Sequence, residues 1–273
     1  MAKRIITGLI LAAIGAGAYL IRLFFAPVYF EFFLWAVTAV CAYEVATVMG
    51  ERTLPCQKWI AIIISSLLGP VFFWLGFTGA AIVAVFGLAA QLSVTVFRHK
   101  DATLEGTGLA VLTTFYPSAL LLAMTAMNNM AEYSFAALLL TVGCATLSDV
   151  FAFVVGSIVK GPKLCPNLSP QKTVAGAVGG IFGGLVAAFA VYAICGIGFE
   201  MAVPKLWFFP VVGVLSALAT EFGDLVESAL KRRLNVKDMS NLLPGHGGFM
   251  DRVDGFSFAA PLVYICFVLY ALL

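Results

Sequence analysis

Long apolar runs, each close to the length that crosses a lipid bilayer, recur along the whole of this 273-residue chain. A helix needs roughly 20 consecutive apolar residues to span the hydrocarbon core. Hydrophobic residues make up 62% of the chain and charged residues only 11%, against ~45–50% and ~25% in an average soluble domain. Because one buried core cannot absorb this excess, the sequence predicts an integral membrane protein.

The apolar runs predict nine transmembrane spans, at 5–25, 28–48, 58–77, 79–97, 106–127, 133–157, 174–198, 206–228 and 255–273. All should be helices, because lipid supplies no water to satisfy the backbone of an open strand. The predicted fold class is therefore all-α, a polytopic membrane helix bundle of about nine transmembrane helices. We treat residues 1–273 as a single integral membrane domain, with N-terminal spans in 1–130 and catalytic spans and cytoplasmic loops in 131–273. The glycine-rich seventh span is interpreted as a site of close helix packing.

The basic residues are divided very unevenly between the two sides of such a bundle. With nine spans, all of the 16 lysines and arginines except Arg22 and Lys205 fall on the side that begins with Lys3 and Arg4. The positive-inside rule then predicts a cytoplasmic N-terminus. The two polar loops, 158–173 and 229–254, should both face the cytoplasm. The first run has no clear cleavage site, so we interpret it as a retained span and not a signal peptide.

The eighth span, "GVLSALATEFGDLVESALKRR", carries acids at membrane depth. Glu221, Asp224, Ser228 and Lys231 are spaced by three or four residues and therefore share one face of a helix. Carboxylates in a membrane span are expensive and usually functional. The alternative is that both acids lie near the helix end and only pair with Lys231 or Arg232.

The loop that follows combines glycines with charged residues. "PGHGG", residues 244–248, would let backbone N–H groups approach a ligand closely. Carboxylates suit Mg²⁺, and cations suit phosphate oxygens. The candidates are Lys237, Asp238, Asp251, Arg252 and Asp254. The alternative, a solvated basic loop against anionic headgroups, explains the lysines and arginines at 231–233 but not the glycines or the "DRVD" run.

A third group lies in "SDVFAFVVGSIVKGPKLCPNLSPQKTVAG". Asp149 falls inside the sixth span, where an unpaired acid is costly. Ser169, Lys172 and Thr173 precede a glycine-rich helix, and we expect the N-terminus of that helix to bind a phosphate group. Taken together, the three groups supply carboxylates for a divalent cation and cations for phosphates at the cytoplasmic ends of the spans. This combination favours phosphoryl transfer between a nucleotide and a lipid.

Residues 228–254, "SALKRRLNVKDMSNLLPGHGGFMDRVD", resemble the signature of the phosphatidate cytidylyltransferase family, also called CDP-diacylglycerol synthases. That pattern reads S-x-x-K-R-x(4)-K-D-x-x-x-x-[LI]-[PG]-G-H-G-G-x-x-D-R-x-D, and every fixed position is matched here. The resemblance implies a membrane enzyme that makes CDP-diacylglycerol and pyrophosphate from CTP and phosphatidate in phospholipid synthesis, with Mg²⁺ and a second ion, K⁺.

The resemblance also implies roles for individual residues. Catalytic roles fall to Asp224, Asp251, Lys231, Arg252 and His246. Substrate binding falls to Ser169, Lys172, Thr173, Ser228, Arg232, Lys237, Asp238, Gly247, Gly248 and Asp254. The metal would be held by Asp224 and Asp251, with Glu221 and Asp149 as further candidates. In one position the chain departs from the family: Ala175 stands where S-P-x-K-T-x-E-G has an acid, which weakens the assignment of the 163–176 loop.

Three alternatives stay open from the sequence: an ion-coupled membrane transporter, the same chemistry on another lipid phosphate, and an inactive relative that serves as a scaffold. The expected partners are CTP, phosphatidate in the cytoplasmic leaflet and membrane lipids, with no nucleic acid. A homodimer is one alternative for the oligomeric state. The expected location is a bacterial inner membrane, with the active site facing the cytoplasm.

Overall fold

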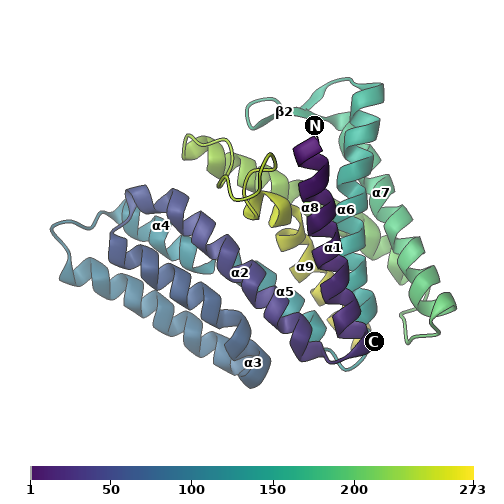
Figure 1. Ribbon diagram of the computed structural model, residues 1–273, viewed down its shortest axis with the longest axis horizontal. Coiled ribbons are helices and arrows are strands. Elements are labelled where there is room, and N and C mark those ends of the chain that lie inside the picture. Colours follow the sequence, from purple (N-terminus) through teal and green to yellow (C-terminus); the bar gives the residue numbers. More distant parts are fainter. Residues whose placement is uncertain (1) are drawn as a thin grey trace. The chain divides into compact units, whose positions relative to one another are not determined.

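The computed structural model describes the backbone of residues 2–273 and the side chains at 7, 8, 10, 11 and 13–273. Lys3 and Arg4, which the orientation argument used, lie outside the described side chains. The helices are α1 (Ala2–Phe24), α2 (Pro27–Met49), α3 (Pro55–Phe97), α4 (Leu104–Phe115), α5 (Ser118–Asn128), α6 (Ser134–Val159), α7 (Val174–Tyr192), α8 (Phe208–Arg233) and α9 (Met250–Ala271). Short helical turns, η1 (Gly50–Arg52) and η2 (Ala193–Gly198), follow α2 and α7, and strands β1 (Lys163–Cys165) and β2 (Ser169–Thr173) precede α7 (Figure 1).

The all-α polytopic architecture predicted from the sequence is confirmed. Within the described part of the chain, seven helical segments are long and apolar enough to cross a membrane. Each of the nine predicted ranges lies mostly on helix. The short hairpin of β1 and β2 was not predicted; Lys163 pairs with Thr173 and Cys165 with Ser169.

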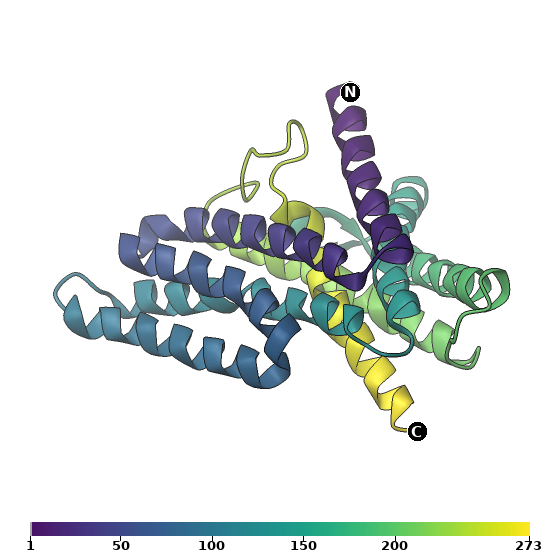
Figure 2. The ribbon, with the colours of Figure 1, turned by 60° about the horizontal axis from the view of Figure 1, so that its bottom comes forward.

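Helix α3 accounts for two predicted spans, because it folds back on itself at Gly76. This glycine has φ 63° and ψ −157°, a conformation outside the helical region that side chains rarely tolerate. Beyond it, Gln91 Nε2 donates to the backbone oxygen of Gln57 at 3.0 Å, and Gly87 lies against Ile64. The two arms therefore run antiparallel, as Figure 2 shows. Pro117, which has no N–H, separates α4 from α5 inside the range predicted as one span.

The described chain divides into two compact units, each of which we describe by itself. One comprises Met1–Ala126 with Leu234–Arg252, and the other comprises Met127–Arg233 with Val253–Leu273. The first contains α2 to α4, whose buried polar side chains link neighbouring elements: Ser65 Oγ donates to the Thr114 oxygen at 2.7 Å. Because a buried donor must find an acceptor, such bonds fix how α3 packs on α4.

In the second unit, α7 packs closely against α6 and α8. Five glycines of α7 are buried: Gly176, Gly179, Gly180, Gly183 and Gly184. A Cβ at Gly184 would lie only 2.5 Å from the Gly213 oxygen of α8. The glycine-rich span is thus a packing surface, as predicted, and it lets the polar ends of α7 and α8 come together.

Candidate active site

The loop between α8 and α9, residues 234–249, is here called the signature loop. Leu243 N donates to the Gly247 oxygen and His246 N to the Leu243 oxygen, both at 2.9 Å, which closes a tight turn. Gly245 and Gly247 have φ of +80° and +79°, a left-handed conformation that favours glycine. The "PGHGG" stretch therefore forms the turn-rich segment that the sequence predicts.

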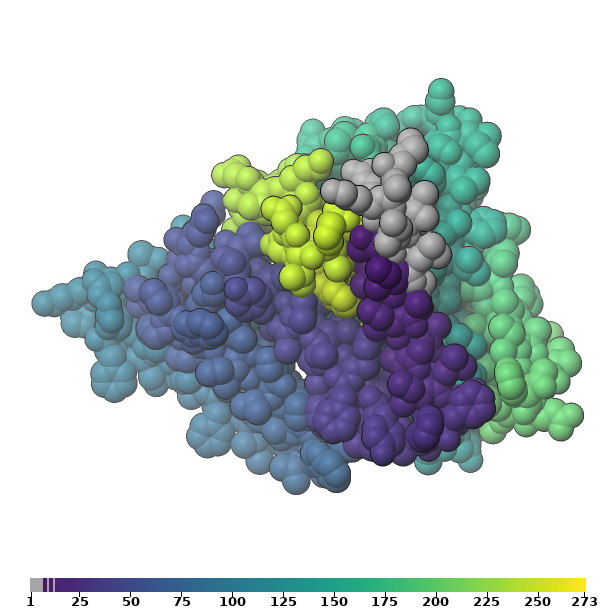
Figure 3. All heavy atoms as spheres, viewed as in Figure 1, coloured from purple at the N-terminus to yellow at the C-terminus, as the bar shows by residue number. Residues whose placement is uncertain are grey.

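The signature loop also contacts α1, which belongs to the same unit. Thr7 Oγ1 donates to the Pro244 oxygen at 3.2 Å, and the half-buried His246 ring lies next to Gly8. Figure 3 shows the described part of α1 alongside the loop. His246, which the resemblance places among the catalytic residues, is therefore packed against a helix of the same unit.

Asp251, in the first turn of α9, holds the signature loop through its side chain. Its Oδ2 accepts from Met239 N at 2.9 Å and from Gly248 N at 2.7 Å, and the residue is buried. A carboxylate has about four acceptor sites, so these two bonds are compatible with a metal on the same group. They also mean that Asp251 shapes the loop whether or not it binds a metal.

In the second unit, the polar face of α8 meets β2. Lys172 Nζ donates to Glu221 Oε2 at 2.8 Å and to Asp224 Oδ2 at 2.7 Å. Burial of the Lys172 ammonium opposes its charge, but Asp224 and Glu221 outweigh that penalty and raise the pKa of Lys172 above the ordinary lysine value. Lys172 is therefore a cation bound to two acids, which the sequence did not predict.

A second ion pair lies farther along the same helix. Lys231 Nζ donates to Glu227 Oε2 at 2.9 Å, and Glu227 is fully buried. The sequence reasoning missed Glu227, although its spacing of four residues from Lys231 was a signal for a helical ion pair. The alternative weighed above, in which the acids of α8 only pair with Lys231 or Arg232, is wrong for Glu221 and Asp224, because Lys172 is the partner of both.

Helices α8 and α9 cross closely enough to bring Asp254 to this group. A Cβ added at Gly223 would lie 2.7 Å from the backbone oxygen of Asp254, and one added at Gly255 would lie 3.2 Å from the side-chain Oδ1 of Asp224. Only glycines allow that approach. As a result, the Asp254 side chain lies beside Glu227 and within electrostatic range of Asp224.

The other predicted substrate-binding residues have varied surroundings. Thr173 Oγ1 accepts from Gly176 N at 3.0 Å and so caps α7. Arg232 Nε donates to the Leu168 oxygen at 3.4 Å. Gly248 is buried and Gly247 is half-buried. Two serines, Ser169 and Ser228, are half-buried, whereas Asp149, Lys237, Asp238 and Arg252 are exposed.

The side chains around Asp224 have the donor types that Mg²⁺ favours. The carboxylates of Glu221, Asp224, Glu227 and Asp254 offer only hard oxygen ligands. Within the part of the chain that the structure describes, no three acidic, histidine or cysteine side chains form a ready-made metal site. A magnesium ion bound here would therefore take further ligands from water or substrate phosphates, as Mg²⁺ usually does.

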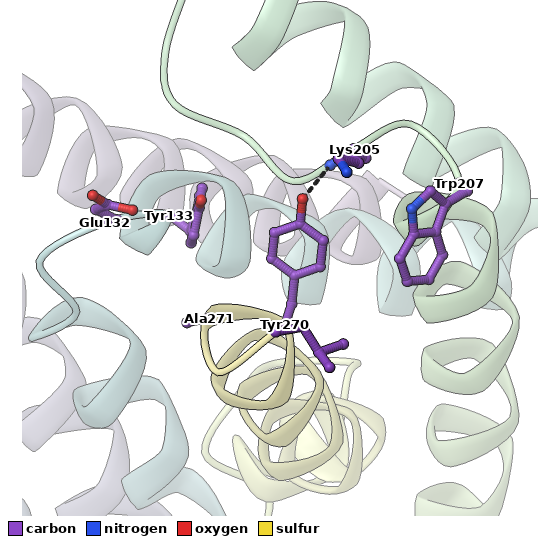
Figure 4. Close-up of a pocket in the computed structure, with 7 residues that line it drawn as sticks. Glu132, Tyr133, Lys205, Trp207, Tyr270 and Ala271 are labelled. Carbon is purple, nitrogen blue, oxygen red and sulfur yellow. Dashed lines mark hydrogen bonds between the residues drawn. The ribbon is translucent and has the colours of Figure 1, made fainter.

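A separate cavity of about 360 Å³ lies at the opposite end of α8 (Figure 4). Its lining residues are Glu132, Tyr133, Lys205, Trp207, Tyr270, Ala271 and Leu273. Lys205 N donates to the Tyr270 hydroxyl at 2.9 Å. The cavity's lining residues from this region come just before α8 in the sequence and from the last turn of α9, so none of the predicted site residues lines it.

Comparison with known proteins decides the family. The Cytidylyltransferase family profile matches residues 2–270. The chain belongs to the cytidylyltransferase family. A Bacillus subtilis (strain 168) protein named phosphatidate cytidylyltransferase is 29% identical over 283 residues, which cover 99% of each chain.

Two further proteins, also named phosphatidate cytidylyltransferase, are similar to this cytidylyltransferase over shorter stretches. The protein from Brucella abortus (strain 2308) is 33% identical over 197 residues, 71% of this chain and 68% of the relative. The protein from Staphylococcus aureus (strain COL) is 39% identical over 122 residues, 45% of each chain. The family resemblance seen in the signature is therefore confirmed over nearly the whole chain.

Proposed function

We propose that this integral membrane cytidylyltransferase is a phosphatidate cytidylyltransferase, which makes CDP-diacylglycerol and pyrophosphate from CTP and phosphatidate. Three relatives carry that name, and the family profile spans residues 2–270. The observation that carries the proposal is the signature loop. Its turn and its left-handed glycines are held by the buried Asp251, which follows the loop in the first turn of α9.

The proposed reaction needs little proton transfer. A phosphatidate oxygen, already ionised at neutral pH, attacks the α-phosphorus of CTP, and the bond from that phosphorus to the bridging oxygen breaks as pyrophosphate leaves. We propose that Asp224 and Asp251 hold Mg²⁺, which supplies charge neutralisation at the phosphate oxygens when bound. The K⁺ ion implied by the resemblance stays a proposal beside it.

The basic side chains are proposed to orient the substrates. Arg232, Lys237 and Arg252 are exposed and can reach phosphate oxygens, for which guanidinium groups are well shaped. Lys172 is already bound to Glu221 and Asp224, so we propose that it first orients the Asp224 carboxylate. Any contact of Lys172 with a substrate phosphate would be additional to that role.

We propose a cytoplasmic site in a bacterial inner membrane, because the loops 158–173 and 229–254 lie on the lysine- and arginine-rich side of the predicted spans. Soluble CTP is then available where phosphatidate is exposed in the same leaflet. A homodimer is a separate proposal, which sedimentation of the detergent-solubilised protein would decide.

The deciding experiment incubates purified protein with radiolabelled CTP, Mg²⁺ and phosphatidate, and looks for a labelled liponucleotide. Substrate-dependent release of pyrophosphate supports the proposal, whereas binding without turnover would favour the transporter alternative. Other lipid phosphates offered in parallel, including an ether-linked one, test the lipid class. The matched inactive variant is Asp251→Asn, which keeps an oxygen to accept from Met239 N and Gly248 N but removes the charge.

A further inference from the structure

A buried acid on α2 has contacts that the sequence analysis did not assign. Glu44 is only 2% exposed. Its Oε1 accepts from Ser240 Oγ at 2.5 Å and from Phe249 N at 2.9 Å, and its Oε2 accepts from Met250 N at 2.7 Å. All of these donors belong to the signature loop or to the first residue of α9, about 200 positions away in the sequence.

These bonds satisfy backbone groups that the start of a helix leaves without partners. The first N–H groups of a helix have no acceptor within the helix itself, and a negative charge near them is favourable. Met250 is the first residue of α9, so Glu44 caps α9 from a different helix. Three consecutive N–H groups are then held by two carboxylates, because Gly248 N donates to Asp251.

The third glycine of "PGHGG" is explained by the same contact. A Cβ at Gly248 would lie 2.8 Å from Glu44 Oε2 and 3.0 Å from Asp251 Oδ2. Both carboxylates approach the backbone at this point, and any side chain would push one of them away. The glycine and Glu44 are therefore parts of one arrangement.

We infer that Glu44 is a positioning residue for the reaction, acting through the signature loop. By fixing Phe249 and Met250 it sets where the first turn of α9 begins, and this turn carries Asp251 and Arg252. The inference rests on the proposed function, since it gives Glu44 a role in orienting the residues proposed to hold the metal and phosphates. Because Glu44 is buried, the proposed role acts through its bonds to the loop and not through direct contact with substrate.

The test compares substitutions at Glu44 with one at a second buried acid of the same helix. Glu44→Gln keeps the size but presents an NH₂ group in place of one acceptor, and Glu44→Asp keeps the charge on a shorter stem. Glu31 is fully buried on α2 and lies about 20 Å away along the helix axis. Glu31→Gln is therefore the matched control for loss of a buried carboxylate.

Two quantities are measured for each variant. The first is kcat and KM for CTP and phosphatidate. The second is the mobility of a spin label at the exposed position of Asn241, in protein whose more accessible cysteines, Cys56, Cys165 and Cys266, are serine. We expect Glu44→Gln to lower kcat at least about tenfold, to change KM less, and to mobilise the label. Glu44→Asp should recover part of both, and Glu31→Gln should change neither.

Two results would overturn the inference. One is Glu44→Gln with kcat within about twofold of wild type and an unchanged label spectrum. The other is an equal loss in Glu31→Gln, which would indicate general destabilisation. An inactive wild-type protein is a different outcome, because it would overturn the proposed function, whereas an active wild type with an unaffected Glu44→Gln would overturn only the inference.

Discussion

Removal of the Lys172 ammonium should destabilise the protein substantially, because it leaves two acids facing each other. Lys172 Nζ lies 2.8 Å from Glu221 Oε2 and 2.7 Å from Asp224 Oδ2, and the three side chains are 22%, 10% and 21% exposed. At an effective dielectric constant of about 20, each contact is worth roughly 6 kcal/mol of Coulomb energy, most of which offsets desolvation. Breaking a buried pair costs about 3–5 kcal/mol, and because these side chains are partly exposed we expect Lys172→Met to cost about 3 kcal/mol.

The assay is chemical unfolding of the detergent-solubilised protein, followed by circular dichroism, for Lys172→Met, Glu221→Gln and the double variant. We expect a coupling free energy of about 2 kcal/mol between the two positions. The control is Arg98→Met, which breaks the exposed pair between Arg98 and Asp101 and should cost under about 1 kcal/mol. The reasoning is refuted if Lys172→Met costs no more than Arg98→Met, or if the coupling is zero within error.

Three other predictions concern Lys172, Gly248 and Asp251. Because the pKa of Lys172 is raised, its ammonium stabilises the folded protein fully below pH 10.5, the ordinary lysine pKa, and this stabilisation is lost as pH rises through the higher folded pKa. In unfolding titrations at alkaline pH, the free energy of unfolding of wild type should therefore fall towards that of Lys172→Met. Gly248→Ala should cost about 1–3 kcal/mol and speed hydrogen exchange at Phe249 and Met250, and unchanged exchange would contradict the contact with Glu44. Asp251→Asn should abolish turnover but leave hydrogen exchange at Met239 and Gly248 as slow as in wild type. Asp251→Ala should abolish turnover and also speed that exchange, because it leaves two buried N–H groups without an acceptor, at a cost of about 1–3 kcal/mol each.

The helices could be predicted from the sequence because hydropathy acts locally. Each predicted span needed only its own run of apolar residues, and lipid then requires helix. The fold-back of α3 at Gly76 lies within two residues of the boundary between the predicted spans 58–77 and 79–97. The break at Pro117 was missed because it lies inside one apolar run. The β1–β2 hairpin was missed because its two strands together contain only eight residues, with no clear alternating pattern.

The partners of the site residues could not be predicted in the same way. Lys172 was predicted to bind phosphate, but which acids it meets depends on how β2 packs on α8. Glu44 was missed although its sequence, "CAYEVAT", places an acid inside an apolar span, which is itself a signal of function. No pattern in a single sequence shows that Glu44 contacts Met250, which lies about 200 residues later in the chain.

The bond between Glu44 and the backbone beside Gly248 has a consequence for recombination of family members. A chimera that takes residues 1–130 from one parent and 131–273 from another inherits the acid and the glycine separately. We expect such hybrids to be active only where both parents have glutamate at position 44 and glycine at position 248. Libraries built by shuffling fragments should therefore keep these two positions as a linked pair.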